Sequence, residues 1–312
     1  MKKDGIDDLP AATPTAAELW DWPLAKRTRW LARSFGVTPR KSLSQSFLIN
    51  DPAAERLAGM VAELGAPGIV EIGGGLGALT VPLVRTAPKL IVYEIDPLLC
   101  EALTHLLSPA GERAKLVGGD FLEADPAADG AGDGWVAMGN LPYSVTTPIL
   151  EKLFLGPPAW KTLLVMVQKE FAQRMAAGPG SRTYGSLSVF ARFYCHEIQP
   201  VMELKPGSFW PQPKVSSSVV RLDLREGAHE AVKDAGRFFE VVRGAFGYRR
   251  KTLLRALATA APMGASEEEI AAGIAAAGLD PKQRPETLGI EEFAALAEGV
   301  AKAVESAGEK GL

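Results

Sequence analysis

Short apolar runs alternate with helical patterns through the middle of the chain, and this alternation limits the fold more than any other feature. Strands are predicted at 68–73, 90–94, 114–117, 135–139 and 162–167, and helices at 76–85, 97–107, 147–154, 168–175 and 186–194. Strands that alternate with helices form βαβ units around a mostly parallel sheet. Two later strands, 198–204 and 216–224, flank the proline-rich loop 206–213 and are expected to pair antiparallel at an edge.

The two ends of the chain differ from this middle part. After residue 226 the sequence is rich in alanine and has helical periodicity, with breaks at Pro262–Gly264, Gly278–Pro281 and Pro285. The start is rich in Pro, Ala and Thr and is followed by Trp20, Trp22 and Trp30. We therefore predict an N-terminal extension over 1–33, an α/β domain over 34–226 and a small all-helical domain over 227–312.

Composition excludes several classes of protein. The chain is 47% hydrophobic and 23% charged, as in ordinary folded domains. Cys100 and Cys195 are far apart and belong to no CxxC pair, so neither a disulfide framework nor a metal site is expected. No apolar run is long enough to cross a bilayer, and Met1–Pro14 lacks the apolar core of a signal peptide. We expect a cytoplasmic protein, monomeric by default, with no membrane contact.

Charge is distributed unevenly along the chain. The formal net charge of −3 argues weakly against nucleic-acid binding. However, the basic residues gather in two stretches, which are Lys26, Arg27, Arg29, Arg33, Arg40 and Lys41, and later Arg237, Arg243, Arg249, Arg250, Lys251 and Arg255. Such a chain can present a basic face despite its negative total. The alternative is a pair of solvated helix faces.

A glycine-rich loop separates a predicted strand from a predicted helix. Within Val70–Thr80 the order Gly-Gly-Gly-Leu-Gly permits a tight turn and a close approach of the backbone to a ligand. Dinucleotide-binding folds, methyltransferases and plain turns all use such loops, although the GxGxG spacing disfavours NAD. Glu94 at the end of the second strand can accept hydrogen bonds from ribose hydroxyls, and Asp120 after the third can bond an adenine amine. Ordinary loop acids or a helix N-cap are the competing interpretation.

Asn140-Leu141-Pro142-Tyr143 follows the fourth strand, at the sheet edge where such folds bind ligands. An exocyclic adenine amine is a poor nucleophile because its lone pair is delocalised into the ring. The Asn140 amide oxygen and the Leu141 carbonyl are suited to accept the two N–H bonds of that amine and so localise the lone pair. Pro142 stiffens the backbone, and Tyr143 can stack on a base that has left its helix. A turn with a satisfied Asn and a packed Tyr is the alternative.

From about Arg40 to Ala297 the chain resembles the small-subunit rRNA adenine N6,N6-dimethyltransferases of the KsgA type. The resemblance rests on Gln45–Leu48, Glu71–Thr80, Glu94–Asp96, Asn140–Leu150, Gln168–Glu170, Tyr184–Val189, Phe209–Val220, Phe246 and Arg249–Thr252. It implies a Rossmann-like class I methyltransferase sheet, mostly parallel with an antiparallel edge strand, plus a small C-terminal all-helical domain. It also implies transfer of four methyl groups from S-adenosylmethionine to two adjacent adenines near the 3′ end of 16S rRNA, late in small-subunit assembly.

The resemblance assigns roles to individual residues. The implied cofactor contacts are Ser46, Leu48, Gly73, Gly75, Glu94, Asp120 and Asn140. The implied catalytic residues are Asn140, Leu141, Pro142 and Tyr143, with Phe209 as a second aromatic wall for the target base. The implied RNA-binding residues are Arg40, Lys41, Lys214, Arg249, Arg250 and Lys251. The partners would be small-subunit rRNA and the assembling small subunit, gripped by backbone and shape, and we hypothesise that Lys26–Lys41 extends this surface.

Three positions depart from the family's pattern. Ser46 stands where relatives usually have an Asn that contacts the cofactor, Gly74 stands where Pro is common, and Arg255 replaces an Asn. Serine is shorter and forms fewer hydrogen bonds, and Gly74 is expected to make the loop more flexible. These departures bear on cofactor affinity more than on activity, because none touches Asn140–Tyr143.

Three other functions remain open. A large-subunit rRNA adenine methyltransferase of the macrolide-resistance type would share the glycine loop and the catalytic segment, although Phe209–Val220 and Arg249–Thr252 favour the small-subunit target. A ribosome-assembly factor would act by binding rather than by methylation. An NAD-dependent oxidoreductase is disfavoured by the glycine spacing and by the lack of a candidate acid or base for hydride transfer.

Overall fold

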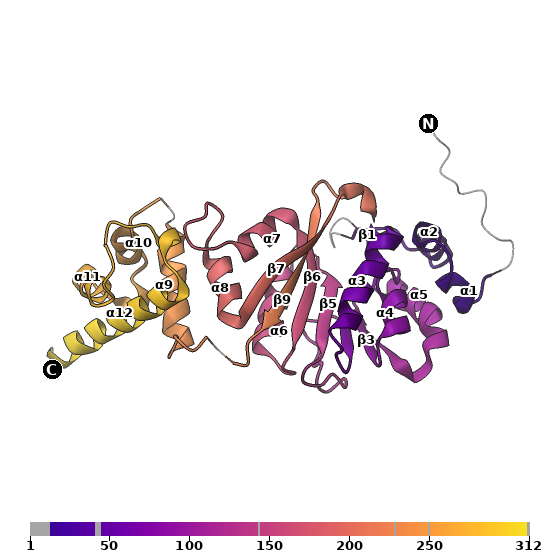
Figure 1. Ribbon diagram of the computed structural model, residues 1–312, viewed down its shortest axis with the longest axis horizontal. Helices are drawn as coiled ribbons and strands as arrows, with labels where there is room; N and C mark the ends of the chain where they lie inside the picture. Colours follow the sequence, from indigo (N-terminus) through magenta and orange to yellow (C-terminus); the bar gives the residue numbers. More distant parts are fainter. Residues whose placement is uncertain (1–12, 41–44, 143, 228, 249, 311–312) are drawn as a thin grey trace. The chain divides into compact units, whose positions relative to one another are not determined.

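Two sheets organise the chain (Figure 1). The computed structural model describes residues 13–40, 45–142, 144–227, 229–248 and 250–310. The larger sheet consists of β2 (Ile69–Ile72), β3 (Leu90–Glu94), β4 (Ala114–Gly118), β5 (Val136–Asn140), β6 (Thr162–Gln168), β7 (Cys195–Leu204) and β9 (Ser217–Leu224), in the order β4-β3-β2-β5-β6-β9-β7. The smaller sheet pairs β1 (Phe47–Leu48) antiparallel with β8 (Phe209–Trp210). The predicted α/β fold, with a mostly parallel sheet and an antiparallel edge, is confirmed.

Several helices begin where a side chain caps the first turn. In chain order they are α1 (Ala16–Trp20), α2 (Leu24–Ser34), α3 (Asp51–Glu63), α4 (Thr80–Thr86), α5 (Pro97–Leu107), α6 (Thr146–Leu155), α7 (Lys169–Ala176), α8 (Ser186–Tyr194), α9 (Ala235–Gly247), α10 (Leu253–Ala260), α11 (Glu267–Ala276) and α12 (Ile290–Lys310). Side chains of Asn50, Asp96 and Ser266 accept hydrogen bonds from the first turns of α3, α5 and α11. Among the described residues, no helix combines the length and apolar character needed to span a membrane.

The helix predicted from residue 76 begins later than expected. Residues 75–79 form turns, and α4 starts only at Thr80. Gly75 and Gly77 have φ values of 57° and 75°, which are incompatible with a right-handed helix. The glycines therefore extend the loop by one turn and move the start of α4 away from the end of β2.

The strand order fixes where a ligand site can lie. Central β2 pairs in parallel with β3 on one side and β5 on the other, so the chain reverses its direction of travel across the sheet at β2. Ligands bind such sheets at the carboxyl ends of the strands beside this reversal. Glu94 is the last residue of β3, Asn140 is the last of β5, and Gly73 directly follows β2. Residues far apart in sequence are therefore brought to one edge.

The chain divides into two compact units. One comprises Met1–Lys169 and Pro200–Arg221, and the other comprises Glu170–Gln199 and Leu222–Leu312. The first is centred on the sheet, with Leu57, Leu83, Val92 and Val136 among its fully buried side chains. The core of the second contains Tyr184, Phe193, Phe238, Phe246 and Phe293. These units differ from the predicted ranges in two respects: α7 and α8 group with the C-terminal helices, and the described part of the extension belongs to the first unit.

Candidate active site

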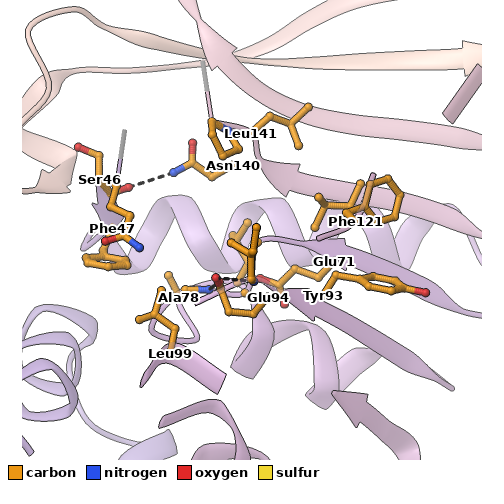
Figure 2. A pocket seen from close by; sticks show the side chains of 18 of the residues that line it. Ser46, Phe47, Glu71, Ala78, Tyr93, Glu94, Leu99, Phe121, Asn140 and Leu141 are labelled. Atoms are coloured by element: carbon orange, nitrogen blue, oxygen red, sulfur yellow. Dashed lines mark hydrogen bonds between the residues drawn. The ribbon is translucent and has the colours of Figure 1, made fainter. Parts of the chain in front are cut away.

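A pocket lies at the carboxyl ends of β2, β3 and β5 (Figure 2). Its lining includes every predicted cofactor position, namely Ser46, Leu48, Gly73, Gly75, Glu94, Asp120 and Asn140. Leu141, Pro142 and Phe209 also line it. Tyr143 lies outside the described residues. Segments from six parts of the first unit therefore converge on one cavity.

Glu94 ties the glycine loop to the end of β3. Its Oε2 accepts a hydrogen bond from the Gly75 N–H at 2.8 Å. Its Oε1 accepts from the N–H groups of Ile95 at 2.9 Å and Asp96 at 3.0 Å. Burial raises the pKa of Glu94, and the three backbone hydrogen bonds oppose that rise. The carboxylate thus sets the shape of the loop and still has acceptor capacity toward the cavity, since two oxygens offer about four lone-pair sites.

Glu71 is a second acidic residue at the pocket, and sequence reasoning gave it no role. It belongs to β2 and is 1% exposed. Burial raises the pKa of Glu71 to about 8, and the charge of Glu94 adds to the rise, while the Thr80 hydroxyl opposes it. Burial therefore favours the neutral form of the Glu71 carboxyl group. A neutral acid avoids the repulsion that two adjacent carboxylates would create.

Asp120 sits in a tight turn after β4. Its Oδ1 accepts a hydrogen bond from the Leu122 N–H at 2.9 Å, so one oxygen stabilises the turn, as the competing interpretation of a loop acid would require. Lys152 of α6 donates from Nζ to the carbonyls of Leu122 and Ala124. This lysine therefore anchors the Asp120 turn to the helix that follows Asn140. Sequence periodicity places Lys152 only on a helix and gives no sign of this contact.

The Asn140 amide is oriented by a residue almost a hundred positions earlier. Its Nδ2 donates to the Ser46 carbonyl at 3.0 Å (Figure 2). Because only the amide nitrogen can donate to a carbonyl, this bond fixes which side of the amide carries Oδ1. The Ser46 hydroxyl donates to the Pro211 carbonyl at 2.7 Å. Ser46 thus joins the end of β5 to the segment after β8.

Pro142 begins the turn into α6. Its carbonyl accepts hydrogen bonds from the Val145 N–H at 3.1 Å and from Thr146 Oγ1 at 3.0 Å. On the other side, the Leu141 N–H donates to the Met166 carbonyl at 3.0 Å. The backbone of Leu141 and Pro142 is therefore held by β6 and by the first turn of α6.

Phe209 lines the pocket from the β1–β8 ladder. It is 2% exposed and pairs with Leu48 across the β1–β8 ladder. Beside it the Phe47 and Trp210 rings stack, with centroids 6.2 Å apart. These short strands join the Gln45–Leu48 segment, where cofactor contacts were predicted, to the segment that contains Phe209.

Gly74 has a packing role. A Cβ at this position would lie 2.5 Å from Val92 Cγ1 and 2.8 Å from Leu103 Cδ1, which is closer than atoms can approach. The Gly74 N–H also donates to the Tyr93 carbonyl at 3.2 Å, a bond that proline lacks the hydrogen to form. Close contact with β3 and α5 therefore favours glycine at this position, and the expected gain in loop flexibility remains a prediction.

The predicted RNA-binding residues fall in both units. Arg40 and Lys214 are exposed in the first, and Arg40 Nη1 lies 3.6 Å from Asp96 Oδ2. Arg250 and Lys251 are exposed in the second, where Lys251 Nζ donates to Thr259 Oγ1 at 3.0 Å. Lys41 and Arg249 lie outside the described residues. Arg255, the third departure, pairs with Glu267 at 3.7 Å on the surface.

Comparison with known proteins identifies the family. The model of the ribosomal RNA adenine dimethylase family matches residues 36–296. The chain belongs to this family. Among curated members, the small-subunit rRNA methyltransferases A of Anoxybacillus flavithermus and Moorella thermoacetica are each 41% identical to it. These matches cover 87% and 86% of this chain and 94% and 95% of theirs.

Solved structures agree with this assignment. A dimethyladenosine transferase from Plasmodium falciparum is 25% identical, with a TM-score of 0.67, and the match covers 83% of this chain and 98% of that one. The 23S rRNA methyltransferase ErmE is 26% identical, with a TM-score of 0.61, and the match covers 82% and 99%. Within the described part of this chain, no group of three or more His, Cys, Asp or Glu residues is arranged to hold a metal.

Proposed function

We propose that this chain dimethylates the N6 amines of two adjacent adenines near the 3′ end of small-subunit rRNA, with S-adenosylmethionine as methyl donor. Family membership and curated relatives named for the small subunit support the target. The observation that carries the chemistry is the orientation of the Asn140 amide at the carboxyl end of β5, where its Nδ2 donates to the Ser46 carbonyl. Its remaining oxygen is the acceptor that an adenine amine requires.

The pocket fits S-adenosylmethionine, which supplies a methyl group on a positively charged sulfur when bound. Glu94 accepts three backbone hydrogen bonds, so about one of its lone-pair sites would remain for a ribose hydroxyl. The second carboxylate oxygen of Asp120 would accept from an adenine amine. Ser46, Leu48, Gly73 and Gly75 would form the wall around them. The raised pKa of Glu71 keeps the site from accumulating two adjacent negative charges.

The target base would enter from the side of Asn140. Asn140 Oδ1 and the Leu141 carbonyl would accept the two N–H bonds of the amine, which directs its lone pair out of the ring plane. Phe209 and Tyr143 would hold the base between them, and Pro142 keeps the segment stiff. No covalent intermediate is needed, so most of the acceleration would come from orientation of the reactants.

RNA binding would rest on the exposed cations. Arg40, Lys214, Arg250 and Lys251, with Lys41 and Arg249, would contact phosphates by charge, with little dependence on sequence. The expected partner is the assembling small subunit. A monomeric state and a cytoplasmic location remain predictions.

A second candidate function is methylation of large-subunit rRNA, which the similarity to ErmE favours. Purified protein and labelled S-adenosylmethionine would be incubated with small-subunit particles and, separately, with naked large-subunit rRNA. Mass mapping would then locate the methyl groups. We expect dimethyladenosine at two adjacent positions of small-subunit rRNA, whereas labelling of large-subunit rRNA alone would overturn the proposal.

The same assay separates methylation from a role in assembly. An Asn140→Ala variant should bind small-subunit particles and leave their adenines unmodified. If that variant also restored assembly fully in a deletion strain, the biological role would lie in binding.

A further inference from the structure

Arg27 is a buried cation in the segment that precedes the family match. It lies on α2, is 4% exposed, and precedes residue 36, where the match begins. Its Nη2 donates to the Gly77 carbonyl at 3.2 Å, and its Nη1 lies 3.5 Å from the Trp20 carbonyl. Burial lowers the pKa of Arg27 to about 10, so the guanidinium is still charged at neutral pH. Removing such a charge from water costs several kcal/mol, so its carbonyl partners matter.

Gly77 is the last glycine of the loop that shapes the pocket. Its φ of 75° favours glycine, and a Cβ there would lie 2.2 Å from Leu106 Cδ2. Its carbonyl also accepts the Val81 N–H at 3.3 Å, at the start of α4. One carbonyl therefore connects the glycine loop, the first turn of α4 and the guanidinium of Arg27.

Apolar packing joins the same segment to the pocket wall. Leu19, Trp30 and Leu31 share a buried cluster with Phe47, Leu76 and Leu99. Phe47, Leu76 and Leu99 also line the pocket. Trp20 Nε1 donates to the Leu106 carbonyl at 2.8 Å, which fastens α1 to the end of α5. Helices α1 and α2 thus pack behind residues whose other side faces the cavity.

We propose that α1 and α2 hold the glycine loop in the shape that binds S-adenosylmethionine, with Arg27 as the positioning residue. This inference rests on the proposed function and adds a role for the segment before the family match. The neighbouring cations Lys26, Arg29 and Arg33 are exposed on the same helix. Of the four cations on α2, Arg27 alone is buried and so does not contribute to the basic surface that the sequence pattern suggests.

The test is an Arg27→Met substitution in the full chain, with Arg29→Met as the matched control. Calorimetry would measure binding of S-adenosylhomocysteine without RNA, and hydrogen exchange would follow the amides of residues 73–81. We expect Kd to rise about tenfold for Arg27→Met, which corresponds to about 1.4 kcal/mol of binding free energy, because the Gly77 carbonyl loses its charged donor. We also expect faster exchange at Gly77 and Val81, and no change for Arg29→Met.

Steady-state kinetics separate positioning from general damage. In Arg27→Met the KM for S-adenosylmethionine should rise while kcat at saturation stays within about twofold, because Arg27 does not touch the reacting atoms. Arg27→Lys, which keeps a donor for the Gly77 carbonyl, should recover part of the affinity. This milder variant also serves if the methionine variant does not fold.

The outcomes distinguish the inference from the function on which it rests. If the unmodified chain bound no S-adenosylhomocysteine, the proposed function itself would fail. If the unmodified chain bound it and Arg27→Met bound it equally well, even with a lowered melting temperature, Arg27 would be merely structural. The same conclusion would follow from equal binding by Arg27→Lys where Arg27→Met does not fold. Equal losses in the Arg27 and Arg29 variants would likewise overturn the positioning role.

Discussion

Asn140→Asp tests whether the orientation of the amide matters for catalysis. The substitution keeps the size of the side chain and one oxygen for the adenine amine. It removes the hydrogen bond from Nδ2 to the Ser46 carbonyl and places a carboxylate oxygen opposite that carbonyl at about the same distance, 3.0 Å in the native protein. Losing the bond costs about 1 kcal/mol, and leaving two acceptors unpaired against each other adds about 1–3 kcal/mol.

The total energetic penalty is about 3 kcal/mol if the substituted side chain stays in place. If the side chain turns away, its contact with the adenine amine is lost. Either way, kcat should fall on the order of 100-fold, since about 1.4 kcal/mol corresponds to a factor of ten. The assay is single-turnover methylation of small-subunit particles with both substrates saturating. Calorimetry with neutral S-adenosylhomocysteine checks that the pocket is intact, and Kd should change by less than about fivefold.

Ser46→Ala is the matched comparison. It leaves the backbone carbonyl that holds Asn140 and removes only the hydroxyl that donates to Pro211. Its cost should be about 1 kcal/mol or less, and its rate should stay within about fivefold. If Asn140→Asp retained activity within threefold of the native protein, or if Ser46→Ala were the more damaging change, the anchored-amide mechanism would be wrong.

Three further substitutions test the pocket. Glu94→Gln supplies one acceptor oxygen for three backbone N–H groups, so Kd for S-adenosylhomocysteine should rise about 10- to 100-fold by calorimetry, and unchanged affinity would contradict the role of Glu94. Burial raises the pKa of Glu71 from 4.5 to about 8, so the native state holds this proton more tightly than the unfolded chain does. The stability that this proton gives at low pH is therefore lost as the pH rises from 4.5 to about 8. The slope is about 1.4 kcal/mol per pH unit, so urea unfolding of ligand-free Glu71→Gln should depend less on pH than the native protein, and equal slopes would refute the assignment. Gly74→Ala introduces contacts of 2.5 and 2.8 Å, and its unfolding midpoint should drop by the equivalent of about 1–3 kcal/mol, whereas an unchanged midpoint would mean the loop moves aside freely.

The sheet and the strand-end residues were predictable because their signals are local. A buried strand followed by glycines indicates a turn at the end of that strand. Glu94 and Asn140 lie at the ends of two later apolar runs, which form β3 and β5. Parallel strands then bring their carboxyl ends to one edge without further information. The late start of α4 was not predicted, because a helical pattern does not reveal that Gly75 and Gly77 adopt positive φ.

The contacts that orient the site were not predictable from pattern. Strands of two residues, such as β1 and β8, leave no periodic signal, and their pairing joins positions about 160 residues apart. Arg27 lies in a purely basic stretch that indicates a solvated surface, and only the fold shows that carbonyls of Trp20 and Gly77 surround it. The sequence shows how many cations a segment carries, but the fold determines which of these cations are exposed to solvent.

Ser46 departs from the expected family pattern but leaves the hydrogen bond that orients Asn140 in place. The side chain at this position differs from the usual Asn, but the group that holds Asn140 is the backbone carbonyl, which any residue supplies. The serine hydroxyl instead fastens the segment to Pro211, beside the β1–β8 ladder that carries Phe209. The serine hydroxyl therefore braces the part of the pocket wall that includes Phe209, whereas an asparagine at this position would, as the family resemblance implies, reach toward the cofactor. On this argument a Ser46→Asn variant should gain affinity for S-adenosylhomocysteine without a gain in kcat, and a rise in kcat alone would show that residue 46 acts on the base side.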